Sequence, residues 1–345
     1  MRKTHLLQGA GGILISALGL YIFFKSVDTT VLWTEIRTTE KWIIAAVVAL
    51  NPLTIWLRSL RWKVMLPDNR QQNSKSGLFS ITMIGFMINN IFPARIGEAA
   101  RAVLLWKRNG FTVMESAGSL FVERTLDTLL YSAFFSIPVF GNSSLASLQP
   151  YAAMMMAVFA LSVLFLVIYS RFKAGTIKIA SKMLILVPDR LKKPVEKLSK
   201  ELISNLEWTF SWHRAMRVLL YSVLMMSCYV VMMCFLAWGL NTFNILDSMF
   251  GVSMAAIGAA IPLSPGYIGT LHSSLLQGLG MVGVVGNKAG AMAVLYHGIG
   301  YITITALGLM FLMSMKVSFK EIRKANEELK KNKGEKENDK AADFS

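Results

Sequence analysis

Charged residues are scarce in this chain of 345 residues. Asp, Glu, Lys and Arg make up only 16% of it, whereas 54% of it is hydrophobic. Several runs continue for longer than about 18 residues with almost no charge, which is the length that a helix needs to cross a bilayer. This composition excludes an ordinary soluble protein. We therefore predict an all-α polytopic membrane protein.

Cysteine and histidine are rare as well, with two and four residues respectively. Cys228 and Cys234 lie in one apolar run on opposite sides of the expected helix, so a disulfide between them is not expected. The histidines lack zinc-ligand spacing, and no glycine-rich loop ends in Lys-Ser or Lys-Thr as a nucleotide-binding loop does. We expect no metal, no cofactor and no ATP-driven step.

Basic residues give the chain a net charge of +16, but they are unevenly placed. Residues 171–217 hold eleven Lys and Arg and residues 316–345 hold nine, while the loops at 141–150 and 241–247 hold none. Cytoplasmic loops of membrane proteins carry such an excess. We predict a protein of the cytoplasmic (inner) membrane with both termini in the cytoplasm. Nucleic acid is not an expected partner, because adjacent spans hold the basic loop at a membrane.

The apolar runs divide the chain into a transmembrane domain over 1–315 and a charged tail over 316–345, predicted to be frayed or disordered. A basic loop at about 171–213 has leucine and valine at helical spacing, which predicts an amphipathic helix lying on anionic lipid. The second span ends in Arg58, Arg61, Trp62 and Lys63, which we interpret as an interfacial anchor. About six full spans are expected, near residues 9–27, 42–60, 113–140, 151–169, 215–240 and 289–314.

The apolar run at 84–105 is interrupted by polar residues. Pro93 removes a backbone donor and disfavours helical conformation at Phe92, so a helix should break there. If the run crossed the membrane, the basic pair Lys107-Arg108 would face outward and every later loop would be inverted. A re-entrant hairpin that enters and leaves on the cytoplasmic side avoids this conflict.

Six charged residues lie at membrane depth in and after this hairpin. Their burial against lipid would cost on the order of 15–20 kcal/mol in total, so they must contact each other, water or a ligand. Arginine suits phosphate because it donates two parallel hydrogen bonds. We predict a substrate site over a purely structural ion network, which remains the alternative. The charges are Arg95, Glu98 and Arg101, at three-residue steps expected to share one helical face, and Glu123, Arg124 and Asp127 on the next span.

A second interrupted segment covers about residues 248–283, and we predict a hairpin that enters from the outside. Its Pro-x-x-Ile-Gly sequence repeats the one at the first break, 172 positions earlier, which fits an inverted repeat of a transporter. Free N–H groups at the start of a half-helix suit an anion. The structural breaks are Pro93, Gly97 and Pro262, and the further substrate-binding candidates are Pro265, Gly266, Gly269, Thr270 and His272.

At these residues the chain resembles the lysylphosphatidylglycerol synthase transmembrane region family of flippase-like membrane proteins. The resemblance rests on Pro93-x-Arg95-x-Gly97-Glu98-x-x-Arg101, Glu123-Arg124-x-x-Asp127, Pro262-x-x-Pro265-Gly266-x-x-Gly269-Thr270 and Arg61-Trp62, and it covers roughly residues 5–315. It implies a domain that moves lipid across the membrane. The family often has an acidic residue shortly after the second glycine, where this chain has Thr270-Leu-His272, so the resemblance does not define the headgroup preference. We expect no aminoacyl-transferase domain and hence no aminoacyl transfer.

The predicted function is a flippase or transporter for a lipid with a phosphate-containing headgroup, either a phospholipid or a polyprenyl-phosphate-linked glycolipid. Arg95, Arg101 and Arg124 would hold the phosphate, and the carboxylates would orient them or carry a proton. One alternative is a membrane enzyme acting on lipid phosphates with Glu98 or Asp127 as base. Another is an accessory protein that binds lipid, or a partner lipid-modifying enzyme, without transport. The sequence leaves the oligomeric state open.

Overall fold

The computed structural model describes residues 2–66, 77–93, 95–172, 205–261, 264–284 and 286–315. Within these ranges every regular element is a helix, which agrees with the predicted fold class. The tail from residue 316, most of the predicted amphipathic basic loop, and Pro262 lie outside them.

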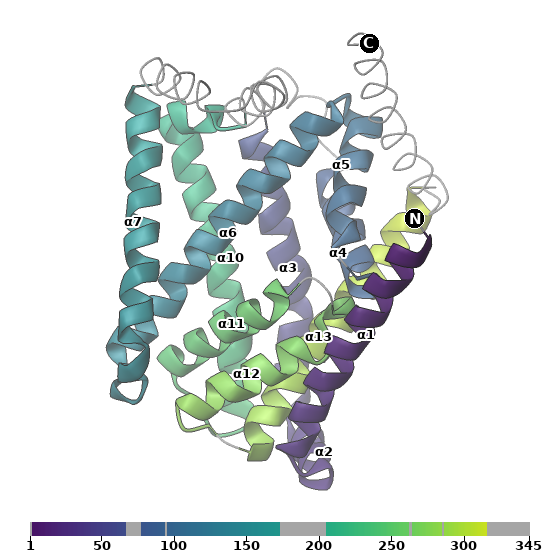
Figure 1. The fold of residues 1–345 in the computed structure, drawn as a ribbon, viewed down its shortest axis with the longest axis vertical. Coiled ribbons are helices and arrows are strands. Elements are labelled where there is room, and N and C mark those ends of the chain that lie inside the picture. The colour runs from purple at the N-terminus through teal and green to yellow at the C-terminus, as the bar shows by residue number, and fades with distance from the viewer. Residues whose placement is uncertain are drawn as a thin grey trace.

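The helices fall into a long and a short group (Figure 1). The long helices are α1 (Arg2–Lys25), α3 (Lys41–Met65), α6 (Val113–Gly141), α7 (Gln149–Arg171), α10 (Trp212–Gly239) and α13 (Gly286–Ser314). The short ones are α2 (Thr29–Thr38), α4 (Leu78–Ile91), α5 (Ile96–Asn109), α11 (Ile245–Ala260) and α12 (Thr270–Met281), with the 3-10 helices η2 (Ser143–Leu148), η4 (Glu207–Phe210) and η5 (Pro265–Tyr267).

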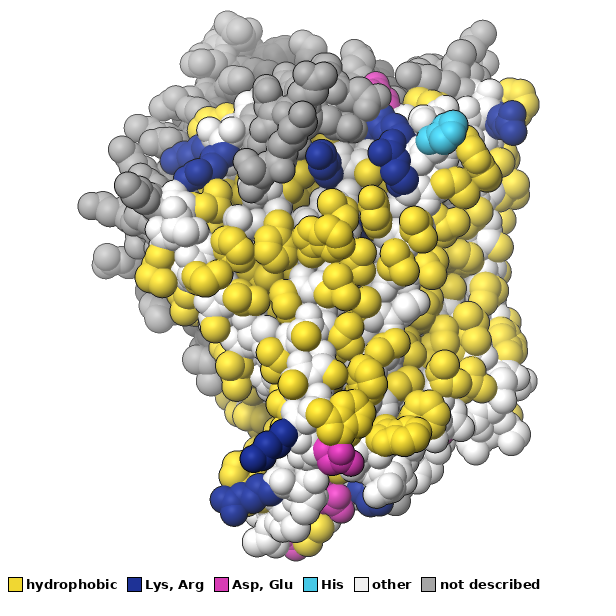
Figure 2. All heavy atoms as spheres, turned by 180° about the vertical axis from the view of Figure 1, so that it is seen from behind, with side chains coloured by type: hydrophobic (Ala, Val, Ile, Leu, Met, Phe, Trp, Pro, Cys, Tyr) yellow, Lys and Arg dark blue, Asp and Glu magenta, His cyan; other side chains and the backbone are white. Residues whose placement is uncertain are grey.

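Four segments are long and apolar enough to cross a membrane: α3, η2 with α7, α10 and α13. A fifth span would result if α1 and α2, bent by 86° at their junction, are counted together. Helix α6 has 29 residues but is not among these segments, and it carries Glu123, Arg124 and Asp127. Figure 2 shows hydrophobic side chains in a broad belt between two ends that carry charged ones. The protein is therefore a multi-pass membrane protein, and the count of six full spans stays a prediction.

Helix α2 replaces the loop expected between the first two spans. Asp28 caps it, because its carboxylate accepts hydrogen bonds from the backbone N–H groups of Thr30 (2.8 Å) and Val31 (3.2 Å). The signal was present in the sequence, since Asp-Thr-Thr before an amphipathic segment is a typical helix start.

Each segment predicted to be a re-entrant hairpin forms a pair of short helices, and the re-entrant topology stays a prediction. Helices α4 and α5 pack side by side in the upper half of Figure 1, and α11 and α12 do so in the lower half, with the connections of both pairs near the middle. The free end of α1 and the end of α13 lie at the same end of the molecule, which agrees with termini on one side. At the first break, Phe92 is extended (φ −113°, ψ 145°), as Pro93 predicts.

Glycine allows α4 and α5 to approach each other closely. A Cβ on Gly97 would lie 1.8 Å from the carbonyl oxygen of Gly85, and a Cβ on Gly85 would lie 2.3 Å from Cγ of Arg101. The side-chain oxygen of Asn89 accepts a hydrogen bond from the N–H of Gly97 at 2.8 Å, which satisfies a free donor in the first turn of α5. The hairpin therefore depends on small residues and on one amide side chain.

Candidate functional site

An ion network joins α3 to α6 in the interior. Arg58 donates to Glu123 at 2.9 Å and to Asp127 at 2.5 Å, and Arg61 donates to Asp127 at 2.6 Å and to Ser222 at 3.2 Å. These two arginines and two carboxylates are at most 4% exposed. Buried charges of this kind require partners, since removing one of them leaves the other uncompensated.

Arg101 ties α5 to the same network. Its two terminal nitrogens donate to the two oxygens of Glu123 at 3.1 and 2.9 Å, and its guanidinium carbon lies 4.3 Å from the ring centroid of Trp62. The indole N–H of Trp62 donates to the hydroxyl of Ser119 at 3.0 Å. Arg101 is 1% exposed, so a ligand would have to displace Glu123 to reach it.

The pair formed by Glu98 and Arg124 lies at the accessible edge of the network. Nε of Arg124 is 2.7 Å from Oε1 of Glu98, and Nη1 of Arg124 is 3.7 Å from Asp127. Their side chains are 25% and 27% exposed, in contrast to the buried members. A ligand can therefore reach Glu98 and Arg124 without dismantling the buried ion pairs.

Arg95 does not share a helical face with Glu98 and Arg101, which corrects the sequence prediction. It is the residue before α5 and has left-handed backbone angles (φ 51°, ψ 39°), so helical spacing does not apply to it. Its Nη2 donates to the carbonyl oxygen of Ala259 in the last turn of α11 at 2.9 Å, and its buried Nε has no hydrogen-bond partner. The guanidinium thus reaches across to the second hairpin.

Arg58 and Arg61 belong to the ion network, although with Trp62 they were predicted to form an interfacial anchor. This interpretation was wrong, because all three are at most 2% exposed and contact the network or its neighbours. A signal was available: two arginines three positions apart lie in an otherwise apolar span, where lone charges are costly. Their position near the end of the span favoured the anchor interpretation.

The arginines of this region outnumber its carboxylates. The ion pairs join four arginines (Arg58, Arg61, Arg101 and Arg124) to three carboxylates. In the described part of the chain Arg95 has a carbonyl partner but no carboxylate partner. The region therefore carries an excess of positive charge, which an anion would balance.

The break of the second hairpin contacts the first hairpin and α1. Gly266 has φ of +56°, and a Cβ there would lie 2.6 Å from the carbonyl oxygen of Asn90 in α4. Gly269 has φ of +89°, and a Cβ there would lie 2.3 Å from the carbonyl oxygen of Ser16 in α1. Thr270 is buried and its hydroxyl donates to the carbonyl of Tyr267 at 3.3 Å. The two glycines therefore permit close backbone contacts.

His272 lies in a cluster of rings between α1, α12 and α13. Its ring centroid is 4.7 Å from that of His297 and 5.5 Å from that of Phe23, and its Nδ1 accepts from the N–H of Gly269 at 3.4 Å. Pro265 is the first residue of η5.

The candidates of the second hairpin thus contact α1 and α13, whereas the ion network lies between α3, α5 and α6. The two groups meet through the contacts from Arg95 to Ala259 and from Gly266 to Asn90.

A small cavity of about 150 Å³ lies between α6 and α11, near this meeting point. Thr128, one turn after Arg124, lines it with Ser132 and Ser253, and Ala260 lines it next to the residue that Arg95 contacts. Most of the other lining residues are apolar, and the three hydroxyl groups donate to backbone carbonyls, so only their oxygens are left to accept a hydrogen bond from a ligand. In the part of the chain that the structure describes, no three His, Cys, Asp or Glu side chains are grouped to hold a metal ion.

Comparison with known proteins gives a consistent result. Residues 9–308 match the model of the lysylphosphatidylglycerol synthase TM region family. A UPF0104 membrane protein of Methanothermobacter thermautotrophicus is 23% identical over 320 residues, which cover 87% of this chain and 94% of the relative. Another from Methanocaldococcus jannaschii is 24% identical over 242 residues, covering 68% and 97%.

A more distant similarity involves a larger protein. Glycosyltransferase AglD of Haloferax volcanii is 23% identical over 154 residues, which cover 45% of this chain but only 25% of that protein. The match thus spans a quarter of the glycosyltransferase. No solved structure gives a significant match to the chain.

Proposed function

Because the chain belongs to the lysylphosphatidylglycerol synthase transmembrane region family, we propose that it moves a lipid with a phosphate-containing headgroup across the cytoplasmic membrane. It acts as a transporter and not as an enzyme. The phosphate is held where the tips of the two hairpins meet, while the hydrocarbon chains stay in the bilayer.

One observation carries this proposal: Arg95 has no carboxylate partner among the described residues, at the point where two broken segments meet. The neighbouring network already contains more arginines than carboxylates. A phosphate group supplies the missing negative charge and accepts hydrogen bonds from arginine in pairs. The small cavity lined by Thr128, Ser132 and Ser253 offers three hydroxyl oxygens as hydrogen-bond acceptors to the rest of the headgroup.

The predicted site residues divide into two roles under this proposal. Arg95, Arg124 and Glu98 contact the headgroup, since the pair of Glu98 and Arg124 is partly exposed and Arg95 is half-buried. Arg101, Glu123 and Asp127 hold the helices around the site, because all three are at most 4% exposed and are fully engaged in ion pairs.

The residues of the second hairpin shape the path of the lipid. Gly266 and Gly269 bring the break against α4 and α1. Pro265 is the first residue of η5, the 3-10 turn that contains Gly266. His272 lies on the side of this break that faces α1 and α13, and the hydroxyl of Thr270 donates to the carbonyl of Tyr267 within the break. A change in the arrangement of these contacts would open the site toward the other side of the membrane.

The proposed topology has six full spans and two re-entrant hairpins of opposite orientation, with both termini in the cytoplasm. It is supported by the short lengths of the hairpin helices, 14 and 14 residues in the first pair and 16 and 12 in the second. It is also supported by the position of the pairs in opposite halves of Figure 1. Opposed broken helices with a midplane site are typical of transporters with inverted repeats.

The substrate class includes both phospholipids and polyprenyl-phosphate-linked glycolipids. The family name refers to a phospholipid, and one relative is named a glycosyltransferase. The latter similarity also favours a partner lipid-modifying enzyme, from which this chain would receive its substrate. The alternatives remain a membrane enzyme on lipid phosphates and an accessory protein that binds lipid without moving it.

Reconstitution into liposomes tests the proposal. The vesicles would contain labelled phosphatidylglycerol, an aminoacylated lipid or a polyprenyl-phosphate sugar, and protein-free vesicles would serve as the control. Faster crossing of one class without covalent change supports transport and identifies the substrate. A covalently altered lipid detected by mass spectrometry would replace transport by the enzyme alternative. Binding without crossing would leave the accessory role.

A further inference from the structure

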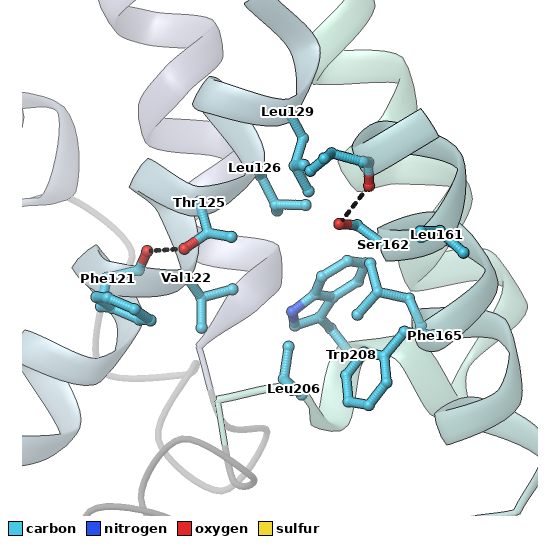
Figure 3. Close-up of a pocket in the computed structure, with 12 residues that line it drawn as sticks. Phe121, Val122, Thr125, Leu126, Leu129, Leu161, Ser162, Phe165, Leu206 and Trp208 are labelled. Carbon is cyan, nitrogen blue, oxygen red and sulfur yellow. Dashed lines mark hydrogen bonds between the residues drawn. The ribbon is translucent and has the colours of Figure 1, made fainter. Parts of the chain in front are cut away.

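A cavity of about 450 Å³ lies between α6 and α7 next to η4 (Figure 3). Its walls are hydrophobic, with Val122 and Leu126 from α6, Leu161 and Phe165 from α7, and Leu206 and Trp208 at η4. The volume is in the range of about 300–1,000 Å³ that ligand pockets occupy. It lies on a different side of α6 from the ion network, because Glu123 and Asp127 contact α3 and α5 instead.

Trp208 has an unsatisfied polar atom at this cavity. Its side chain belongs to a residue that is 5% exposed, and Nε1 has no hydrogen-bond partner. In Figure 3 the indole nitrogen faces the side of the cavity formed by α6. A buried N–H without an acceptor costs free energy, and native structures rarely leave one unpaired. An apolar ligand with one hydrogen-bond acceptor would satisfy both the walls and the indole.

A second cavity of about 420 Å³ continues on the other side of Trp208. It shares Leu166 and Trp208 with the first, and its walls also include Arg171 and Trp212. Arg171 is the last residue of α7, so a cation lies at the helix end beyond the apolar part of the groove. Along the axis of α7 the groove therefore presents first an apolar wall, then the indole N–H of Trp208 from η4, and then the guanidinium of Arg171.

This order matches the parts of a glycerophospholipid. We propose that a glycerophospholipid binds between α6, α7 and η4 as a bound, untransported lipid. One acyl chain fills the first cavity, an ester carbonyl accepts the hydrogen bond from Nε1 of Trp208, and the phosphate lies beside Arg171. Only 6% of the most apolar stretch of η2 and α7 is buried within the protein, so lipid is also the neighbour that this helix requires.

Quenching of tryptophan fluorescence by acyl-brominated phosphatidylglycerol tests this site. The chain has eight tryptophans, so the contribution of Trp208 is the difference between the wild-type protein and Trp208→Phe. Phenylalanine keeps an aromatic ring but has no N–H. We expect the wild-type protein to lose more fluorescence than Trp208→Phe. Equal quenching of the two proteins would mean that no lipid chain reaches Trp208 and would overturn the proposal.

Two variants on α7 separate a defined site from general contact with the bilayer. Ser162 lines the cavity, whereas Ala160 is exposed on another side of the helix. Ser162→Phe should fill the cavity and remove the quenching of Trp208, and Ala160→Phe should leave it unchanged. If Ser162→Phe has no effect, bulk lipid and not a seated chain is the quencher.

The phosphate contact is tested by the amount of lipid that remains bound to the purified protein. Arg171→Gln should reduce the retained phosphatidylglycerol severalfold in native mass spectrometry. Arg37→Gln, on exposed α2, is the matched control and should retain as much as the wild-type protein. Equal retention in all three proteins would contradict the assigned orientation. These readouts do not depend on transport, so failure here would leave the proposed function untouched.

Discussion

Nη2 of Arg95 lies 2.9 Å from the carbonyl oxygen of Ala259, and this hydrogen bond joins the tips of two hairpins that are distant in the sequence. The C-terminal end of a helix carries a partial negative charge, so the last turn of α11 holds this guanidinium without a carboxylate. A phosphate is a stronger acceptor for the same group. Under the proposed function, substrate binding and the contact between the hairpins therefore compete for one side chain.

The buried and the accessible carboxylates should differ in their effect on stability. Glu123→Gln leaves Arg58 and Arg101 without their buried counter-charge, which should destabilise the protein by about 3–5 kcal/mol. Glu98→Gln affects a partly exposed pair and should cost no more than about 1 kcal/mol. Thermal unfolding in one detergent measures both. Equal losses for the two variants would contradict the division of roles.

The close approach of α4 and α5 predicts a strong effect of one methyl group. Gly97→Ala places Cβ against the carbonyl of Gly85 and should destabilise the protein by at least about 1–3 kcal/mol. Gly298→Ala in α13 is the control, since no atom lies within 4 Å of its new Cβ. That change should be neutral or stabilise by up to about 1 kcal/mol. A Gly97→Ala protein as stable as the wild type would exclude this packing.

A feature of this arrangement could be predicted from the sequence only where its physical cause acts between neighbours in the chain. Pro93 acts on its own neighbour, so the break at Phe92 could be predicted from the sequence. The partners of Glu123 could not, because Arg58 lies 65 positions away and only tertiary packing brings it within 2.9 Å. Arg95 was misplaced for a local reason: the left-handed backbone there removes it from the helical repeat.

The proposed topology predicts which loops reagents can reach. On a background in which Cys228 and Cys234 are replaced by alanine, Ser144→Cys and Phe243→Cys should react with an impermeant thiol reagent in intact cells. Lys107→Cys should react only after permeabilisation, because α5 returns to the cytoplasmic side. Labelling of Lys107→Cys in intact cells would mean that the segment of α4 and α5 crosses the membrane fully.

The most direct test of the account is the translocation rate of Arg95→Gln and Arg124→Gln in liposomes, with Arg37→Gln as the control on exposed α2. The assay uses the lipid that the wild-type protein moves, at equal amounts of folded protein confirmed by thermal unfolding. We predict at least about a tenfold loss of rate for the first two variants, as one lost charge-assisted contact of about 1.5–3 kcal/mol implies. The control should retain the wild-type rate. Folded Arg95→Gln and Arg124→Gln proteins that move the lipid at the wild-type rate would contradict the site.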